Sequence, residues 1–212
     1  MRDFPVFTTE NGVGSIVLKE IPYRGVAYVT IRDSSFPTDF LQECVEFCRM
    51  AGAEHVYASG HSILESYTLH TAVIRMSASW HLLPETDACL FPVTEATLSQ
   101  WCEIYNRKMK DVDNAAYMSQ KAAKEMLERG DGYYIHRDGN LLGIGIASDN
   151  RIDCVASVAK SAGREIVAAL SHALMSDQII LEVASTNSRA IALYEALGFI
   201  PVTEVSRWYK IL

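Results

Sequence analysis

The fold of this chain is decided by residues 181–199, LEVASTNSRAIALYEALGF. The aliphatic run at 179–183 predicts a buried strand of a mixed sheet. Asn187 can cap the next helix, since its side-chain oxygen can accept a hydrogen bond from a first-turn amide. The apolar residues of that helix fall on one face, and Gly198 supplies a left-handed stop. They are Ala190, Ile191, Tyr194 and Leu197.

Tyr194 is the residue of this helix that packing explains least. Capping and core packing account for Asn187, Leu193, Leu197 and Gly198. A buried tyrosine also needs a partner for its hydroxyl. Two roles for Tyr194 therefore stay open, a functional hydroxyl and an ordinary core side chain.

Residues 151–174 predict a second strand, loop and helix ahead of that stretch. Residues 152–158 indicate the strand, 160–165 the loop, and apolar residues from Ile166 to Leu174 the buried stripe of the helix. A small-residue loop that leads from a strand into a helix forms an anion site. The first helical amides there have no partners, and the helix dipole favours negative charge.

Together these segments resemble the GNAT family, the GCN5-related, acetyl-CoA-dependent N-acetyltransferases. The resemblance rests on Asn187 at the turn, the triplet 193–195 (LYE) and the triplet 197–199 (LGF), at the family's spacing. It covers residues 88–212 and implies an α/β (α+β) fold with a GNAT-type mixed central sheet flanked by helices. It also implies an enzyme that moves an acetyl group from acetyl-CoA, its co-substrate, to an amine.

The resemblance further implies which residues hold the coenzyme. In the family, the strand before the loop contacts the thioester carbonyl and pantetheine, and the loop cradles the pyrophosphate. The implied set is Val155, Ala156, Ser157, Val158, Lys160, Ser161, Ala162, Gly163, Arg164, Asn187 and Tyr194. The loop departs from the family pattern at Glu165, which places a carboxylate where a small neutral residue is expected.

Tyr194 and Glu182 are the predicted catalytic residues. Acyl transfer to an amine needs a base for the ammonium proton and an acid for the departing thiolate. The resemblance assigns the acid to Tyr194 and the base to Glu182, which lies twelve residues earlier, as in members that acetylate protein N-termini. A carboxylate within a buried strand should be paired, at an edge or functional, so contact with solvent or Arg151 is the alternative. Asp153, His136 or a water are the other candidate bases.

The order of elements indicates two units. Residues 88–212 form the GNAT-type unit, with a second helix at 115–129 and a hairpin that turns at 138–139. Residues 1–84 indicate a smaller α/β unit, with strands at 15–19, 26–31, 55–59 and 71–76 and a helix at 38–50. That order matches the C-terminal half of the resembling family. Residues 1–84 are thus a degenerate second copy without a coenzyme site, or an unrelated packing domain. Residues 81–87 are the predicted linker.

The composition restricts the kinds of molecule that this chain could bind and the compartment in which we expect it. The net charge of −7 argues against nucleic acid, which requires clustered Lys and Arg, and suits an amine or a basic peptide. No apolar run approaches the roughly 20 residues that span a membrane, and the N-terminus lacks a signal-peptide core. We therefore expect a cytoplasmic protein. Its five cysteines fit reduced thiols. Cys44 and Cys48 fit a helix core better than a metal site, and no metal is expected.

The sequence leaves the acceptor open, either a small-molecule amine or a peptide, and it leaves the oligomeric state undetermined. Four residues could line an acceptor groove or simply pack in the core: Trp101, Tyr105, Tyr117 and Met118. Two other classes of function also remain. One is a non-catalytic coenzyme A-binding or regulatory module, and the other is a structural protein that binds no coenzyme.

Overall fold

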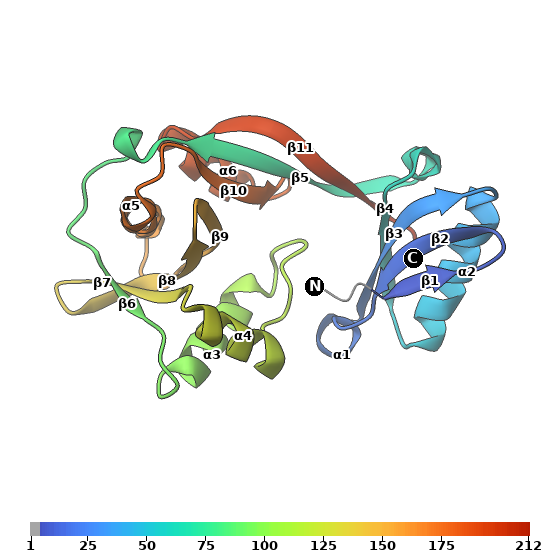
Figure 1. Cartoon of the computed structure of the whole chain (residues 1–212), viewed down its shortest axis with the longest axis horizontal. Coiled ribbons are helices and arrows are strands. Elements are labelled where there is room, and N and C mark those ends of the chain that lie inside the picture. The colour runs from blue at the N-terminus through green and yellow to red at the C-terminus, as the bar shows by residue number, and fades with distance from the viewer. Residues whose placement is uncertain (1–4) are drawn as a thin grey trace. The chain divides into compact units, whose positions relative to one another are not determined.

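The computed structural model describes residues 5–212 and divides into two compact units (Figure 1). Unit 1 contains residues 5–73 and 204–212, and unit 2 contains residues 74–203. Strands β5 (Thr68–Ala78) and β11 (Ile200–Lys210) each begin in one unit and end in the other. The sequence placed the division at 84–88 instead, because Pro84 suggested a linker.

Unit 1 is a small sheet with one long helix. Its strands are β1 (Val6–Thr8), β2 (Gly12–Val17), β3 (Val26–Ser34) and β4 (His55–Ser59), in the order β1-β2-β3-β4-β11. Short helices α1 (Ile21–Arg24) and η1 (Ser62–Ser66) connect them. Helix α2 (Pro37–Met50) crosses between the parallel strands β3 and β4 and buries Phe40, Leu41, Cys44 and Cys48. The predicted order of strand, strand, helix, strand, short helix, strand is confirmed for β2 through β5.

Unit 2 contains the two segments that dominate the sequence. Its sheet has the order β11-β5-β10-β9-β8-β7-β6. The elements are η2 (Trp80–Leu82), β6 (Cys89–Pro92), α3 (Leu98–Met109), α4 (Gln120–Arg129), β7 (Gly132–Arg137), β8 (Asn140–Ser148), β9 (Arg151–Ser157), α5 (Gly163–Leu174), β10 (Ile179–Ala184) and α6 (Ser188–Ala196). Strands β6 to β9 are antiparallel neighbours, whereas β9 and β10 are parallel. The predicted mixed sheet is confirmed.

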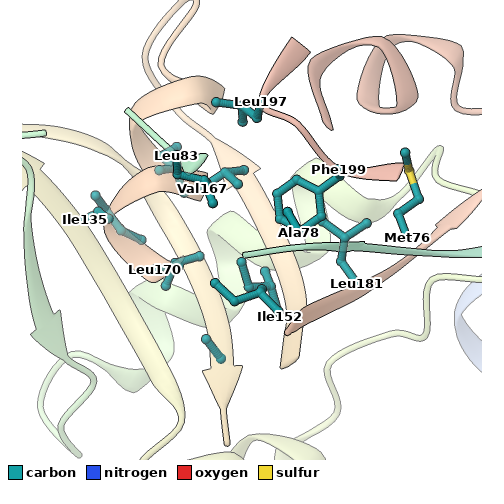
Figure 2. Close-up of a cluster of buried hydrophobic side chains, with 14 of the residues drawn as sticks. Met76, Ala78, Leu83, Ile135, Ile152, Val167, Leu170, Leu181, Leu197 and Phe199 are labelled. Carbon is teal, nitrogen blue, oxygen red and sulfur yellow. The ribbon is translucent and has the colours of Figure 1, made fainter. Parts of the chain in front are cut away.

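Helices cover both faces of the unit 2 sheet. Helices α5 and α6 pack on the face that carries Ile152, Leu181 and Val183. Figure 2 shows Met76, Leu181 and Phe199 at one end of this cluster, and Ile135 and Leu170 at the other. Helices α3 and α4 pack on the opposite face, against a second cluster that includes Ile144, Cys154 and Ala156. From Cys154 onward the side chains of β9 alternate, since Cys154 and Ala156 face this second cluster and Val155 packs against the first. Ile152 and Cys154 face opposite layers although they are two residues apart, so the alternation is interrupted between them.

Two glycines of β8 bring α5 close to the sheet. A Cβ atom at Gly143 would lie 2.5 Å from Ile166 Cδ1 and 2.3 Å from the Ala156 carbonyl oxygen. A Cβ atom at Gly145 would lie 2.6 Å from Leu170 Cδ1. Side chains at either position would push α5 away from β8. The glycines therefore fix where the N-terminus of α5 lies relative to β9.

Three predicted boundaries need correction. Helix α4 begins at Gln120 rather than 115, because the Ser119 side chain accepts a hydrogen bond from the Ala122 amide at 3.3 Å. Helix α5 begins at Gly163, so residues 163–165 form its first turn instead of a loop. Residues 81–87 do not separate the units, since Leu83 is buried in unit 2 and the His172 ring lies 3.0 Å from the Pro84 carbonyl oxygen.

Candidate active site

The parallel strands β9 and β10 diverge in the middle of the unit 2 sheet. Their register pairs only Arg151 with Ile180 and Ile152 with Leu181. Beyond these pairs, residues 153–157 and 182–184 continue as strands without facing one another in register. Two strands that stop pairing while both continue leave an opening between them with unpaired backbone groups.

A β-bulge lies at the point of divergence. Cys154 pairs with Ile146 of β8, whereas Ile152 pairs with Ala147, so Asp153 is the additional residue on β9. A bulge bends its strand and increases the local twist. This bend directs β9 away from β10 while leaving β9 paired with β8 as far as Ser157.

Backbone groups of β9 point into this opening. The Val158 amide donates to the Leu142 carbonyl at 2.8 Å, so Ser157 and Gly143 form a non-hydrogen-bonded pair. The N–H and C=O of Ser157 therefore point away from β8, and those of Val155, two residues earlier, do the same. These two amides lie where a thioester carbonyl or an amide-containing chain could bind as an additional strand.

The segment 158–162 links β9 to α5 and leaves the start of the helix open. The Ser157 hydroxyl donates to the Ala159 carbonyl at 2.5 Å, which fixes the turn. Ser161 has a left-handed backbone (φ 62°), which is strained for a residue other than glycine and is common at binding loops. Ala162 is the N-cap residue of α5 and has no side chain that could cap it. The first amides of α5 are therefore free to bind an anion.

Charged side chains surround this segment. Lys160 and Arg164 are exposed, and neither forms an ion pair among residues 5–212. The Glu165 carboxylate, which the sequence placed as a repulsive charge near a pyrophosphate, forms an ion pair with Arg137 of β7. The arginine compensates the negative charge, so the electrostatic objection raised by Glu165 is weakened.

Gly163 is in close contact with α6. A Cβ atom at this position would lie 2.9 Å from Leu193 Cδ2. Part of the need for glycine is thus packing between α5 and α6, in addition to close approach of a ligand to the backbone. This contact could not be predicted from local sequence pattern, because thirty residues separate the two positions.

The turn into α6 matches its prediction closely. The Asn187 side-chain oxygen accepts a hydrogen bond from the Ala190 amide at 3.2 Å and caps the helix. Gly198 has a φ of 91°, the left-handed backbone expected after the helix. The Thr186 hydroxyl donates to Asp113 at 2.6 Å, which ties this turn to the segment between α3 and α4.

The Tyr194 hydroxyl lies near β9. Its ring packs against the core under α5 and α6, 5.9 Å from the ring of Phe199. Burial raises the pKa of the Tyr194 hydroxyl to about 12, and the nearby Cys154 thiol adds to the rise. Within residues 5–212 the hydroxyl forms no hydrogen bond, so it is available to a ligand.

Glu182 is engaged by two arginines. Its Oε1 accepts hydrogen bonds from Arg75 Nη2 at 2.7 Å and Nε at 3.1 Å, and Arg151 Nη2 lies 3.7 Å away. The side chain points to the face opposite Leu181 and Val183. The alternative contact with Arg151 is therefore confirmed, whereas Arg75, 107 residues away, was missed. No described contact joins Glu182 to Tyr194.

The remaining candidates divide between core and surface. Trp101 and Tyr105 are buried core residues of α3, and the Trp101 indole donates to the Tyr133 carbonyl at 3.0 Å. Met118 is partly buried, and its backbone is held by both groups of the Asn106 amide. Tyr117 is also partly buried.

Two candidate bases lie elsewhere. Asp153 is exposed and pairs with Arg151 at 3.3 Å. His136 on β7 packs edge-on against Phe91.

The cysteines are free thiols, and the buried ones pack in the core rather than act as reactive groups. All five are free thiols, in agreement with the prediction. Burial raises the pKa of Cys44 to about 12 and that of Cys48 to about 11, so both remain protonated and inert. Within the described part of the chain, no three or more His, Cys, Asp or Glu side chains form a group that could hold a metal ion. No described helix is long and apolar enough to span a bilayer.

Comparison with known proteins supports the fold at the level of structure. No protein-family model and no curated protein matches the sequence. Solved structures do match, at low sequence identity. A functionally unknown conserved protein from Staphylococcus epidermidis is 12% identical, with a TM-score of 0.59 over 99% of this chain and 94% of its own.

Two further matches have a stated family. A GCN5-related N-acetyltransferase from Sphaerobacter thermophilus is 11% identical, with a TM-score of 0.62 over 94% of this chain and 76% of its own. A tandem GNAT protein from the clavulanic acid biosynthesis pathway is 13% identical, with a TM-score of 0.55 over 94% and 78%. The chain therefore has the fold of the GCN5-related N-acetyltransferases.

Proposed function

We propose that this protein transfers an acetyl group from acetyl-CoA to the amine of a small molecule or peptide. The observation that carries the proposal is the opening between β9 and β10, followed within one short segment by the uncapped N-terminus of α5. One end of this arrangement offers backbone donors to a thioester, and the other offers amides and two free cations to a pyrophosphate.

The strand, the loop and the predicted catalytic residues have separate roles in this proposal. The Val155 and Ser157 backbones bind the pantetheine chain and polarise the thioester carbonyl. The amides at 163–165, with Lys160 and Arg164, hold the phosphates. The amine loses a proton to Glu182 or to a water and attacks the carbonyl carbon. The new N–C bond forms as the C–S bond breaks, and the departing thiolate takes the Tyr194 proton. An acceptor that starts as an ammonium gives its first proton to the base before attack, and the attacking nitrogen releases a second proton to water as the amide forms. Solvent then returns a proton to Tyr194.

One observation favours a second candidate, a coenzyme A-binding module without catalysis. Glu182 is already paired with Arg75 and Arg151, so its charge is compensated before any amine arrives. Such a module would bind acetyl-CoA through the same loop and would not turn it over.

Thiol release from acetyl-CoA with a panel of amines and peptides separates the two functions. Acceptor-dependent thiol release, with mass increase of the acceptor by one acetyl group, supports the transferase. Thermal stabilisation by acetyl-CoA without any turnover supports the binding module. A ligand at about 100 times its dissociation constant should add about 2.7 kcal/mol to the free energy of unfolding. The free thiols fit the reducing cytoplasm that we propose as its location.

A further inference from the structure

Four charged side chains form a network across three neighbouring strands of unit 2. Arg75 comes from β5, Glu182 from β10, and Arg151 and Asp153 from β9. Arg75 binds Glu182 through two hydrogen bonds to one oxygen, and Arg151 lies between Glu182 at 3.7 Å and Asp153 at 3.3 Å. The network holds two positive and two negative charges.

The network lies beside the opening. Arg151 belongs to the first of the two register pairs of β9 and β10, and Asp153 is the bulge residue where the strands part. Glu182 directly follows the last paired residue of β10. The four side chains lie on the face opposite the layer of α5 and α6. The four side chains are partly exposed there, so a coenzyme held at the start of α5 leaves this part of the face accessible to the second substrate.

The network is accessible, and it adds little to stability. The exposed fractions of the side chains are 36% for Arg75, 27% for Glu182, 39% for Arg151 and 45% for Asp153. Exposed ion pairs contribute about 0 to 1 kcal/mol each to the free energy of unfolding. Fold stability thus gives only a weak reason to gather four charges at the point where the sheet opens.

The balance of charges favours a zwitterion over a simple amine. A guanidinium binds a carboxylate through two parallel hydrogen bonds, and a carboxylate binds an ammonium. An amine without an acidic group offers nothing to Arg75 and leaves Glu182 compensated. A ligand with both groups can replace both halves of the Arg75–Glu182 pair at once.

We propose that this network is the acceptor subsite and that the acceptor is a free amino acid, with its carboxylate near its amine. This inference rests on the proposed transferase function. The acceptor carboxylate takes the Arg75 guanidinium from Glu182, and Glu182 then accepts a proton from the acceptor ammonium. The neutral amine attacks the thioester with the bond changes given above. Arg75 is thus the specificity residue, and it keeps Glu182 compensated until the correct acceptor binds.

Matched acceptors and one substitution test the inference. Each of a set of amino acids is compared with its methyl ester and its decarboxylated amine, by thiol release, on the intact chain and on Arg75→Gln. For the unaltered protein we expect kcat/KM at least tenfold higher for the amino acids. In Arg75→Gln, kcat/KM for the amino acids should fall at least tenfold, mainly because KM rises. The kcat/KM for the decarboxylated amines should stay the same or increase. Arg75→Lys keeps the charge without the bidentate geometry, so its kcat/KM for amino acids should lie between those of the unaltered protein and Arg75→Gln.

Lys121→Gln is the matched control, because it removes an exposed cation from its pair with Glu125 on α4, outside the network. It should leave the preference intact. Equal use of amino acids and decarboxylated amines, or an equal loss for both in Arg75→Gln, would overturn the acceptor assignment and leave the transferase function standing. Failure of every acceptor, with no stabilisation by acetyl-CoA, would instead overturn the transferase function and this inference together.

Discussion

Replacing Tyr194 by Phe separates catalysis from packing. The substitution keeps the ring against Phe199 and removes a hydroxyl that has no hydrogen bond within residues 5–212. The free energy of unfolding should therefore change by less than about 1 kcal/mol. If the hydroxyl protonates the departing thiolate, turnover should fall about 10²-fold, which is about 2.7 kcal/mol in activation free energy. Affinity for acetyl-CoA should not change.

The pH dependence adds a second measurement. Because burial raises the pKa of Tyr194 to about 12, the proton stays on the hydroxyl throughout the neutral range. Deprotonation of Tyr194 should therefore not lower the rate of thiol release by the unaltered protein below about pH 11. The profile of Tyr194→Phe should be lower by a constant factor from pH 6 to 9, as measured by initial rates at saturating acetyl-CoA.

Tyr134 provides the matched control. Burial also raises its pKa, but its hydroxyl donates to the Thr97 carbonyl at 2.7 Å, in the layer of α3 and α4. Tyr134→Phe should lose about 1 kcal/mol of stability and keep its turnover. Full turnover in Tyr194→Phe, on an acceptor that the unaltered protein acetylates, would refute the acid role and leave Tyr194 a core residue.

Three further predictions follow from the start of α5 and from the buried thiols. Ala162→Ser adds a hydroxyl beside the first amides of α5, where it can compete with a phosphate, so it should weaken acetyl-CoA binding; tighter binding in calorimetry would argue against an anion site. Glu165→Gln frees Arg137 and should tighten acetyl-CoA binding by less than about fivefold, whereas Arg137→Gln should weaken it; matching effects of the two variants would contradict this. The raised pKa values of Cys44, Cys48, Cys154 and Tyr194 mean that the native state holds protons that the unfolded chain releases, so stability should fall as the pH rises above about 9; a melting temperature that stays flat from pH 8 to 10 under reductant would refute this.

Local signals made the C-terminal segment predictable. Asn187 and Gly198 each have one strong conformational preference, and the structure places them as cap and stop. The buried strand at 179–183 and the apolar stripe of the helix from Ile166 to Leu174 followed from apolar spacing. These features depend on residues close together in sequence, where backbone preference and periodicity decide the outcome.

Helix starts were less predictable because apolar spacing does not mark a polar first turn. Gly163 to Glu165 carry no buried side chain, so the pattern began only at Ile166. The start of α4 is fixed by the Ser119 cap and by the hydrogen bond from the Met118 amide to the Asn106 side chain. The hydrogen bond to Asn106 joins residues twelve positions apart, so local sequence does not reveal it. The N-cap at Ala162 has no side-chain signal at all.

Contacts between distant residues decided the rest. The Glu182–Arg75 pair joins residues 107 positions apart and the Glu165–Arg137 pair joins residues 28 positions apart, while the bulge at Asp153 depends on how β9 aligns with β8. The division into units also depends on β5 and β11, each of which is shared by both units. A linear pattern shows that such strands exist, but not what they lie beside.

Calorimetric titration of the intact chain with acetyl-CoA tests the central claim most directly. The account predicts one molecule per chain, because the first turn of α2 in unit 1 lacks the Pro37 amide hydrogen and carries the Asp39 carboxylate, which repels a phosphate. Lys160→Gln combined with Arg164→Gln should weaken binding at least tenfold, with little change in stability, while Lys121→Gln should not. No binding by the unaltered protein, or equal affinity in the double variant, would contradict a coenzyme site at the opening between β9 and β10.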